Sequence, residues 1–140
     1  MVETNVSNDK KWLILDLDHT LIHSTKTPPA GINPDLGLAY PDYETYWVKK
    51  RPYLDTFLAK VGKHYNLCLF TAGKRCYAEP ILAHLMSSTH FCQVMCWENV
   101  TQFGDGSYFK DLSKLNIDLE QAILVDDQEN ITFQVDNHLL

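Results

Sequence analysis

The sequence predicts an α/β fold in which a parallel β-sheet is flanked by helices. Continuous apolar runs, typical of strands buried on both faces of a sheet, alternate with segments whose apolar residues recur at helical spacing. The chain has 140 residues, enough to bury one hydrophobic core and too few for two. We therefore expect a flexible N-terminal segment over residues 1–11 and a single domain over residues 12–140.

The first half of the chain is expected to contain two strands, a loop and a helix. Residues 12–17 form a short apolar run that ends in acidic residues, as buried strands often do. Residues 25–43 are rich in Pro, Gly, Asn and Asp and predict a loop, and residues 46–49 predict a short edge strand. Arg51 and Pro52 are expected to open a helix, because Pro is well tolerated in a first helical turn.

The second half is expected to continue the alternation. Residues 74–86 have helical spacing but contain Pro80, and Pro inside a helix costs about 3 kcal/mol, so we expect a kink or a restart there. A short helical stretch should begin at residues 111–115. The remaining strands are predicted at residues 66–71, 92–97 and 121–125, with residues 138–140 either a fifth strand or no strand.

Composition and charge exclude several classes of protein. The formal net charge is −6, which argues against binding to nucleic acid or to an anionic membrane surface, since both require a basic protein face. The chain has no apolar run of about 18 residues and no apolar segment in its polar start. We expect an intracellular protein, cytoplasmic or nuclear, acting as a monomer, with its four cysteines reduced.

Polar side chains follow three of the predicted strands at the points where the strands end. Asp16 and Asp18 follow the first strand, Thr71 the second, and Asp126 and Asp127 the fourth. Ligands of open α/β sheets bind beyond the carboxyl ends of the strands, so these side chains should meet in one cleft. They should be joined there by a lysine from a loop, Lys110. Four carboxylates repel one another unless a cation lies among them, and oxygen ligands favour Mg²⁺.

Four motifs in this order resemble the haloacid dehalogenase superfamily: DLDHT at residues 16–20, LFTAG around Thr71, YFKDLSKL around Lys110 and VDD at residues 125–127. The segments KRPYLDTFL, LFTAGKRCYAEPIL and FKDLSKL are similar to the capless phosphatases that act on the carboxy-terminal repeats of RNA polymerase II, and to their Dullard-like, NLI-interacting factor-like relatives. The resemblance implies a Rossmann-like sheet with a short β insertion after the first strand, and Mg²⁺-dependent hydrolysis of phosphomonoesters.

The resemblance also implies a role for each motif residue. Asp16 would be the nucleophile that forms an aspartyl phosphate, and Asp18 the general acid and base. Thr71, Ala72 and Lys110 would bind the phosphoryl group. The metal would be held by Asp16, by the backbone carbonyl of Asp18 and by Asp127, while Asp126 would orient Lys110 or a metal-bound water within the same metal site.

The sequence leaves the substrate open. The gaps between the motifs have no room for a cap domain, and an open cleft favours phosphoserine or phosphothreonine in a protein or peptide. The alternatives are a phosphatase for small or nucleic-acid phosphomonoesters, and a catalytically silent module that binds phosphoproteins. Polymerase repeats are a doubtful substrate, since the relatives carry an arginine–acid–serine segment where this chain has residues 96–99.

Several further residues have two interpretations. His19 and His23 could tune the first motif, or they could simply pack locally or face solvent. Lys74 and Arg75 could attract substrate anions or begin a solvated helix. The aromatic residues of the predicted loop and edge strand form either a small satellite core or a wall of the substrate cleft; they are Tyr40, Tyr43, Tyr46 and Trp47.

Overall fold

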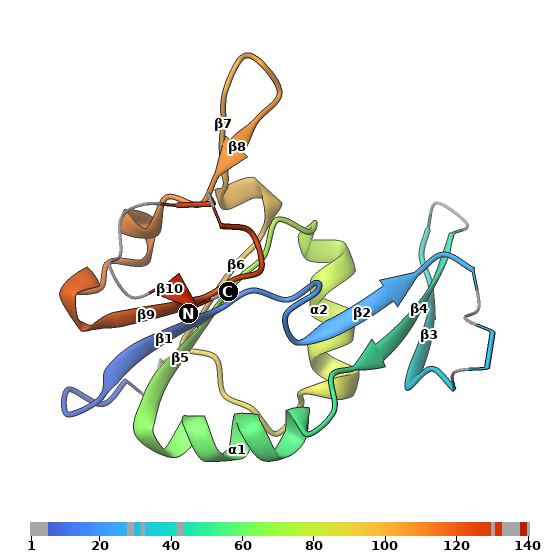
Figure 1. Cartoon of the computed structure of the whole chain (residues 1–140), viewed down its shortest axis with the longest axis horizontal. Helices are drawn as coiled ribbons and strands as arrows, with labels where there is room; N and C mark the ends of the chain where they lie inside the picture. Colours follow the sequence, from blue (N-terminus) through green and yellow to red (C-terminus); the bar gives the residue numbers. More distant parts are fainter. Residues whose placement is uncertain are drawn as a thin grey trace.

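The computed structural model describes residues 6–27, 30–31, 33–41, 44–129, 131–132 and 138–139. Its centre is a five-stranded sheet with the strand order β10-β9-β1-β5-β6, in which every neighbouring pair is parallel (Figure 1). The strands are β1 (Lys11–Leu15), β5 (Tyr65–Phe70), β6 (Gln93–Met95), β9 (Ala122–Val125) and β10 (His138–Leu139). The predicted α/β class and parallel sheet are therefore confirmed.

The two faces of the sheet pack against different elements. Leu13 and Leu15 of β1 face one way and belong to a core with α1 (Leu54–His64) and α2 (Arg75–Leu85). Ile14 faces the other way, because side chains alternate along a strand. It packs with short 3-10 helices, which are η1 (Trp97–Asn99), η2 (Leu112–Leu115) and η3 (Leu119–Gln121). The central strand β1 is thus buried on both faces, as its continuous apolar run predicts.

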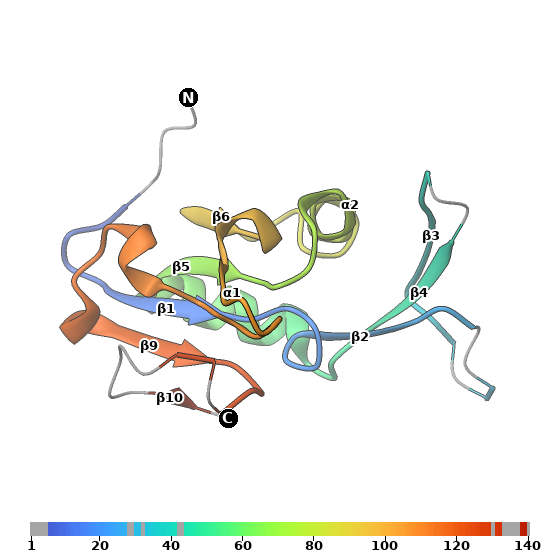
Figure 2. The same cartoon turned by 90° about the horizontal axis from the view of Figure 1, so that it is seen from above.

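The segment after β1 differs from the prediction, because part of the expected loop is strand. A second sheet has the order β2-β4-β3 and is antiparallel, and it lies to one side of the main sheet (Figure 2). Its strands are β2 (Ile22–Thr25), β3 (Leu36–Ala39) and β4 (Thr45–Lys50). The strand predicted over residues 46–49 is present as β4, but its assignment as an edge strand is wrong, since β4 is the middle strand of this sheet.

Cross-strand packing explains why local composition missed β3. Gly37 lies opposite Trp47 in the ladder, and a Cβ atom at Gly37 would lie only 2.6 Å from the Trp47 ring. Glycine lowers strand propensity, yet here it is what allows the indole to pack across the neighbouring strand. The contact joins residues ten apart in the numbering and has no local signature.

Both helices differ in detail from the prediction. Helix α1 begins at Leu54 rather than at Arg51, after Tyr53, whose φ of 66° places it in the left-handed region. Helix α2 continues through Pro80 without a restart. Pro80 removes one backbone donor, but Ala78 and Ile81 are fully buried against the sheet, and tertiary packing overrides a local cost of this kind.

The two ends of the chain can also be compared with the prediction. Residues 1–5 lie outside the described residues; the backbone of Ser7 donates to the Asn66 side chain at 2.9 Å, and Asn66 donates back to the Ser7 carbonyl. The fifth strand is present as His138–Leu139. No helix in the described part of the chain is long and apolar enough to cross a membrane.

Candidate active site

The polar residues after the strands are fixed by backbone bonds that extend the sheet. The N–H of Asp16 donates to the Val125 carbonyl at 3.0 Å, and that of Thr71 to Met95 at 2.9 Å. Asp126 is held in the same way by Leu139 of β10. These residues therefore sit at one edge of the sheet, the edge formed by the carboxyl ends of parallel strands.

The structure brings every sequence-predicted site residue to one pocket of about 190 Å³. Lys110 reaches it from the segment after β8 (Tyr108–Phe109), where its N–H donates to the Ile131 carbonyl at 2.9 Å. Gly73 also lines the pocket; it belongs to the LFTAG motif, but the sequence analysis assigned it no role. The predicted members are Asp16, Asp18, Thr71, Ala72, Lys110, Asp126 and Asp127.

Lys110 is the electrostatic centre of the pocket. Its side chain is 2% exposed, and its ammonium lies 2.9 Å from Oδ1 of Asp16 and also contacts Oδ2 of Asp126. The Thr20 hydroxyl donates to the other oxygen of Asp16 at 3.1 Å. Burial raises the pKa of Asp16, and the charge of Lys110 offsets part of that rise.

Three carboxylates form a group that could hold a cation. One oxygen each of Asp16, Asp126 and Asp127 lies within 4.8 Å of the others. The first two are buried and Asp127 is exposed. Asp126 also accepts the N–H of Gln128 at 2.9 Å, so its two oxygens are held by Gln128 and Lys110. Hard carboxylate oxygens at one end of a pocket are the donor set that Mg²⁺ prefers.

The segment after β5 presents hydrogen-bonding groups to the same pocket. The Thr71 side chain is buried, and its oxygen accepts the N–H of Gly73 at 3.0 Å. Because that bond uses a lone pair of the oxygen, the hydroxyl proton is left to donate to a ligand. Ala72 lines the pocket between them, and its N–H has no acceptor among the residues that the structure describes.

Asp18 lies where the pocket opens into a wider cleft. Both cavities include Asp18, His19, Ala72 and Gly73. The Tyr77 hydroxyl donates to Oδ1 of Asp18 at 2.6 Å. Burial is the largest influence on Asp18 and raises its pKa, which favours the protonated form that a general acid needs.

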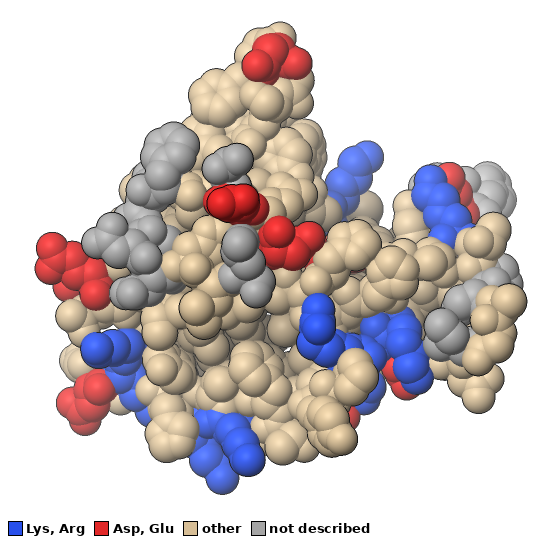
Figure 3. Space-filling view, viewed as in Figure 1, with Lys and Arg blue, Asp and Glu red and all other residues tan. Residues whose placement is uncertain are grey.

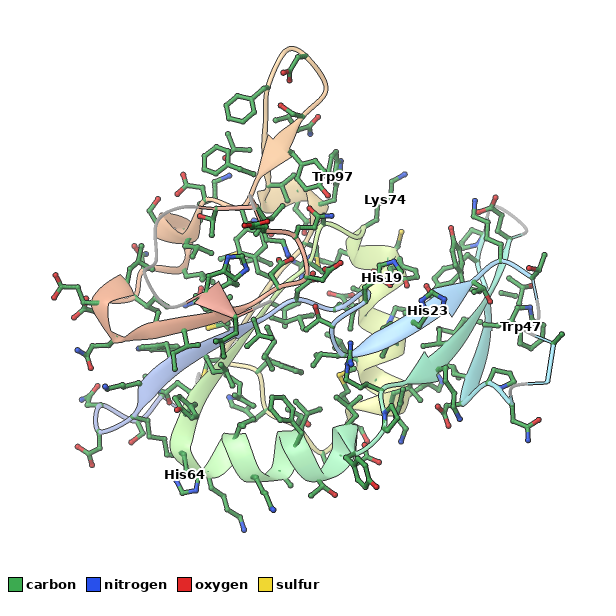
Figure 4. The ribbon with its side chains drawn as sticks, in the orientation of Figure 1. His19, His23, Trp47, His64, Lys74 and Trp97 are labelled. Atoms are coloured by element: carbon green, nitrogen blue, oxygen red, sulfur yellow. The ribbon has the colours of Figure 1, made fainter. Side chains whose placement is uncertain are left out.

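The wider cleft has a volume of about 820 Å³, and four aromatic side chains stand among the residues that line it: Tyr40, Tyr46, Tyr77 and Trp97. Tyr40 and Tyr46 pack edge to face with ring centroids 5.3 Å apart, and Trp97 lines the cleft with Lys74. Trp97, Lys74 and His19 are labelled in Figure 4, in the region above the carboxyl ends of the strands. Tyr77 and Trp97 were missed by sequence analysis, because aromatic residues at helical or strand positions resemble core residues.

The aromatic residues that had two interpretations have different positions in the structure. Tyr40 and Tyr46 pack together and also line the cleft, so the two predicted roles coexist. Trp47 lies instead against Gly37 and lines another pocket, so grouping it with those tyrosines was wrong. Tyr43 lies outside the described residues.

The charged residues and the histidines with two interpretations also differ in their contacts. Arg75 pairs with Glu98 and Glu79, whereas Lys74 lines the cleft. His19 and His23 contact each other with their Nδ1 atoms 3.3 Å apart, and His19 also lines the pocket that contains Asp16 and Lys110. Figure 3 shows acidic atoms near the centre of this face, and basic atoms where β4 leads into α1.

Comparison with known proteins places this pocket in a family context. A family described as NLI interacting factor-like phosphatase matches residues 11–140. CTD small phosphatase-like protein 1 of Caenorhabditis elegans is 39% identical over 123 residues, which are 85% of this chain and 24% of that protein. CTD small phosphatase-like protein 2 of Dictyostelium discoideum is 33% identical, over 94% of this chain and 23% of that protein.

A solved structure agrees with these matches. The structure of Fcp1, described as an essential RNA polymerase II CTD phosphatase, has a TM-score of 0.73 and 25% identity, and the match covers 94% of this chain and 41% of that one. The chain thus spans about a quarter of the length of the two curated relatives and less than half of the solved chain.

Proposed function

Because the chain belongs to the NLI interacting factor-like phosphatase family, we propose that it hydrolyses phosphomonoesters through an aspartyl phosphate on Asp16. The observation that carries this proposal is the buried contact of Asp16 with Lys110, 2.9 Å apart, with Asp18 in the same pocket. A nucleophile, a cation and a second acid then surround a space that suits a phosphoryl group.

The chain's own residues supply two complementary half-reactions. In the first, a carboxylate oxygen of Asp16 bonds to phosphorus, the bond from phosphorus to the ester oxygen breaks, and Asp18 gives its proton to that oxygen. In the second, Asp18 takes a proton from water, whose oxygen bonds to phosphorus as the bond to Asp16 breaks. Inorganic phosphate leaves, and Asp16 and Asp18 return to their starting states.

Lys110 and the segment after β5 stabilise the transferring group. The Lys110 ammonium offsets negative charge on the phosphoryl oxygens, and stabilisation by fixed charges and donors is usually the largest part of catalysis. The Thr71 hydroxyl and the Ala72 N–H would donate to the same oxygens. The contact of Lys110 with Asp126 holds the ammonium at this position.

Mg²⁺ is the cofactor that the donor set fits. The proposed ligands are Asp16, Asp127 and the backbone carbonyl of Asp18, with Asp126 supporting the site through Lys110 or a bound water. When bound, the ion would neutralise the carboxylates and make phosphorus more electrophilic.

A phosphorylated serine or threonine in a protein is the proposed substrate. The catalytic pocket of about 190 Å³ is small, and it adjoins the cleft of about 820 Å³ that could take the residues around the phosphate. The relatives are named for the polymerase carboxy-terminal domain. The resemblance noted in the sequence implies an arginine in the segment where this chain has Trp97 and Glu98, so we do not extend the proposal to polymerase repeats.

The test compares the wild type with Asp16→Asn, each with Mg²⁺ and with excess chelator. We expect aryl phosphate hydrolysis that requires Mg²⁺ and is abolished in Asp16→Asn, together with an acid-stable phosphoenzyme trapped only in the wild type. A panel of phosphoserine peptides, nucleotides and sugar phosphates then ranks substrates by kcat/KM. A wild type that is inert under every condition but binds phosphopeptides would overturn the enzyme proposal and favour a silent binding module.

A further inference from the structure

The side chain of Tyr77 extends from α2 and contacts the loop that follows β1. Its hydroxyl lies 2.6 Å from Oδ1 of Asp18 and 2.6 Å from Oγ of Ser24. Oγ of Ser24 is in turn 3.4 Å from the same oxygen of Asp18. Three side chains from separate elements therefore meet at one carboxylate oxygen.

The contacts divide the two oxygens of Asp18 into different environments. Both hydroxyls approach Oδ1, whereas Oδ2 accepts no hydrogen bond from the residues that the structure describes. Asp18 itself lines the catalytic pocket. With Oδ1 fixed from the cleft side, Oδ2 is the oxygen left to exchange a proton with a leaving group.

Tyr77 is itself held through both its backbone and its ring. Tyr40 donates its hydroxyl to the Tyr77 carbonyl at 2.9 Å, and the rings of Tyr46 and Tyr77 pack with centroids 5.3 Å apart. A Cβ atom added at Gly73 would lie 3.0 Å from the Tyr77 ring, so the glycine leaves room for the ring. A phenol fixed in this way loses little entropy when it bonds a carboxylate.

The hydroxyl chain suits a group that both gives and takes a proton. A hydroxyl is a donor and an acceptor at once, so Ser24, Tyr77 and Asp18 can stay in contact through both half-reactions. A lysine or arginine in place of Tyr77 could only donate, and would oppose the protonated form of Asp18.

We propose that Tyr77 is a positioning residue, which with Ser24 holds Asp18 so that one carboxyl oxygen faces the leaving group. This inference rests on the proposed function, since it assigns Tyr77 to the acid step of that reaction. Tyr77 acts through Asp18 and is not itself required to touch the phosphate.

The proposal predicts a dependence on the leaving group. A positioned acid matters most when the departing oxygen is strongly basic, as in phenyl or seryl phosphate, and least for p-nitrophenyl phosphate. The ratio kcat/KM covers only the steps up to departure of that oxygen, so it isolates the acid step from hydrolysis of the phosphoenzyme. Loss of positioning should therefore steepen the dependence of kcat/KM on the basicity of the leaving group.

The experiment measures kcat/KM for a series of substituted phenyl phosphates and for a phosphoserine peptide. The variants are Tyr77→Phe and Ser24→Ala, with Asp18→Asn as the benchmark for complete loss of the acid. Tyr65→Phe is the matched control, because it also removes a phenolic hydroxyl, at the opposite end of β5. Thermal unfolding of each variant reports whether the fold is retained.

We expect Tyr77→Phe to lower kcat/KM for phenyl phosphate about tenfold, which is a fraction of the usual contribution of general acid catalysis. For p-nitrophenyl phosphate, the same variant should lower kcat/KM less than about threefold. Ser24→Ala should shift the slope in the same direction by less, and Tyr65→Phe should match the wild type. An equal decrease along the whole series, or none, overturns the positioning role while leaving the proposed function intact. A wild type without activity overturns both.

Discussion

The ammonium of Lys110 lies 2.9 Å from the carboxylate of Asp16, although 94 residues separate the two in the sequence. Both side chains are buried, and Asp126 shares the same ammonium. One cation thus faces two carboxylates inside the protein. The ammonium offsets the charge of two buried carboxylates, and we propose that it also stabilises the phosphoryl group during transfer.

Removing that cation should affect both stability and activity. We expect Lys110→Met to lower the free energy of unfolding by about 3 kcal/mol, because two buried carboxylates lose their partner. Activity should fall by at least about 100-fold, in the range seen when one stabilising donor is lost. Urea denaturation and aryl phosphate hydrolysis measure the two effects.

Two further variants separate the causes. Lys60→Met removes an exposed lysine from α1 and should leave both quantities unchanged. Lys110→Arg keeps the charge in a different shape, so it should remain folded while losing most of the activity. Full activity in Lys110→Arg would show that charge alone, without the position of the ammonium, is sufficient.

Asp18 should make stability depend on pH in a defined direction. Burial raises the pKa of this carboxyl above its unfolded value. A raised carboxyl pKa favours folding at low pH, and this contribution is lost as the pH rises through the folded pKa. Asp18→Asn cannot ionise, so its melting temperature relative to the wild type should increase from pH 3 to pH 7, a window set by the Asp pKa of about 3.9 in unfolded chains.

The measurement is thermal unfolding in chelator, so that no cation binds the neighbouring carboxylates. Asp9→Asn is the matched control, because Asp9 is exposed and its replacement changes the net charge equally. A constant difference between Asp18→Asn and the wild type at all pH values would contradict the burial argument.

The four cysteines should differ strongly in reactivity. Cys76 is exposed, whereas the other three are buried. Burial raises the pKa of Cys68 to about 12 and that of Cys96 to about 11, so at pH 8 these thiols carry almost no thiolate. A disulfide reagent should label Cys76 rapidly and the others only after denaturation, and Cys76→Ser should abolish the fast phase.

Tyr53 offers a test of backbone strain. It precedes α1 with a φ of 66°, and the residue is 86% exposed. A left-handed backbone costs roughly 1–2 kcal/mol in residues other than glycine. Tyr53→Gly should therefore be more stable than Tyr53→Ala by about 1 kcal/mol in urea denaturation. Equal stability of the two variants would place the strain elsewhere.

The sequence predicts the main sheet because its signals are local. The strands around Leu13, Leu69 and Leu124 are continuous apolar runs, and the acids that follow β1 and β9 stand directly after them. The topology of a parallel sheet then brings those ends together. The strands of the main sheet and seven of the residues that line the pocket could therefore be predicted without coordinates, and the catalytic roles of those residues are proposals.

The parts that could not be predicted depend on contacts between distant segments. The sequence predicts that Arg51 opens a helix, but α1 begins at Leu54, and the guanidinium of Arg51 donates to the Thr20 carbonyl at 2.6 Å and to the His19 carbonyl at 3.2 Å. It therefore braces the loop after Asp18. Tyr77 likewise has an ordinary helical position, and only the placement of α2 beside that loop reveals its contact with Asp18.

The central place of β1 sets the order in which the site can form. In the ladder Leu15 pairs with Leu69 on one side and with Val125 on the other. During synthesis Asp16, the proposed nucleophile, leaves the ribosome before Lys110 and the acids that follow β9. Folding that needs such late partners is slow, since long loops must close first. The growing chain should therefore have no phosphatase activity until β9 emerges and completes the pocket.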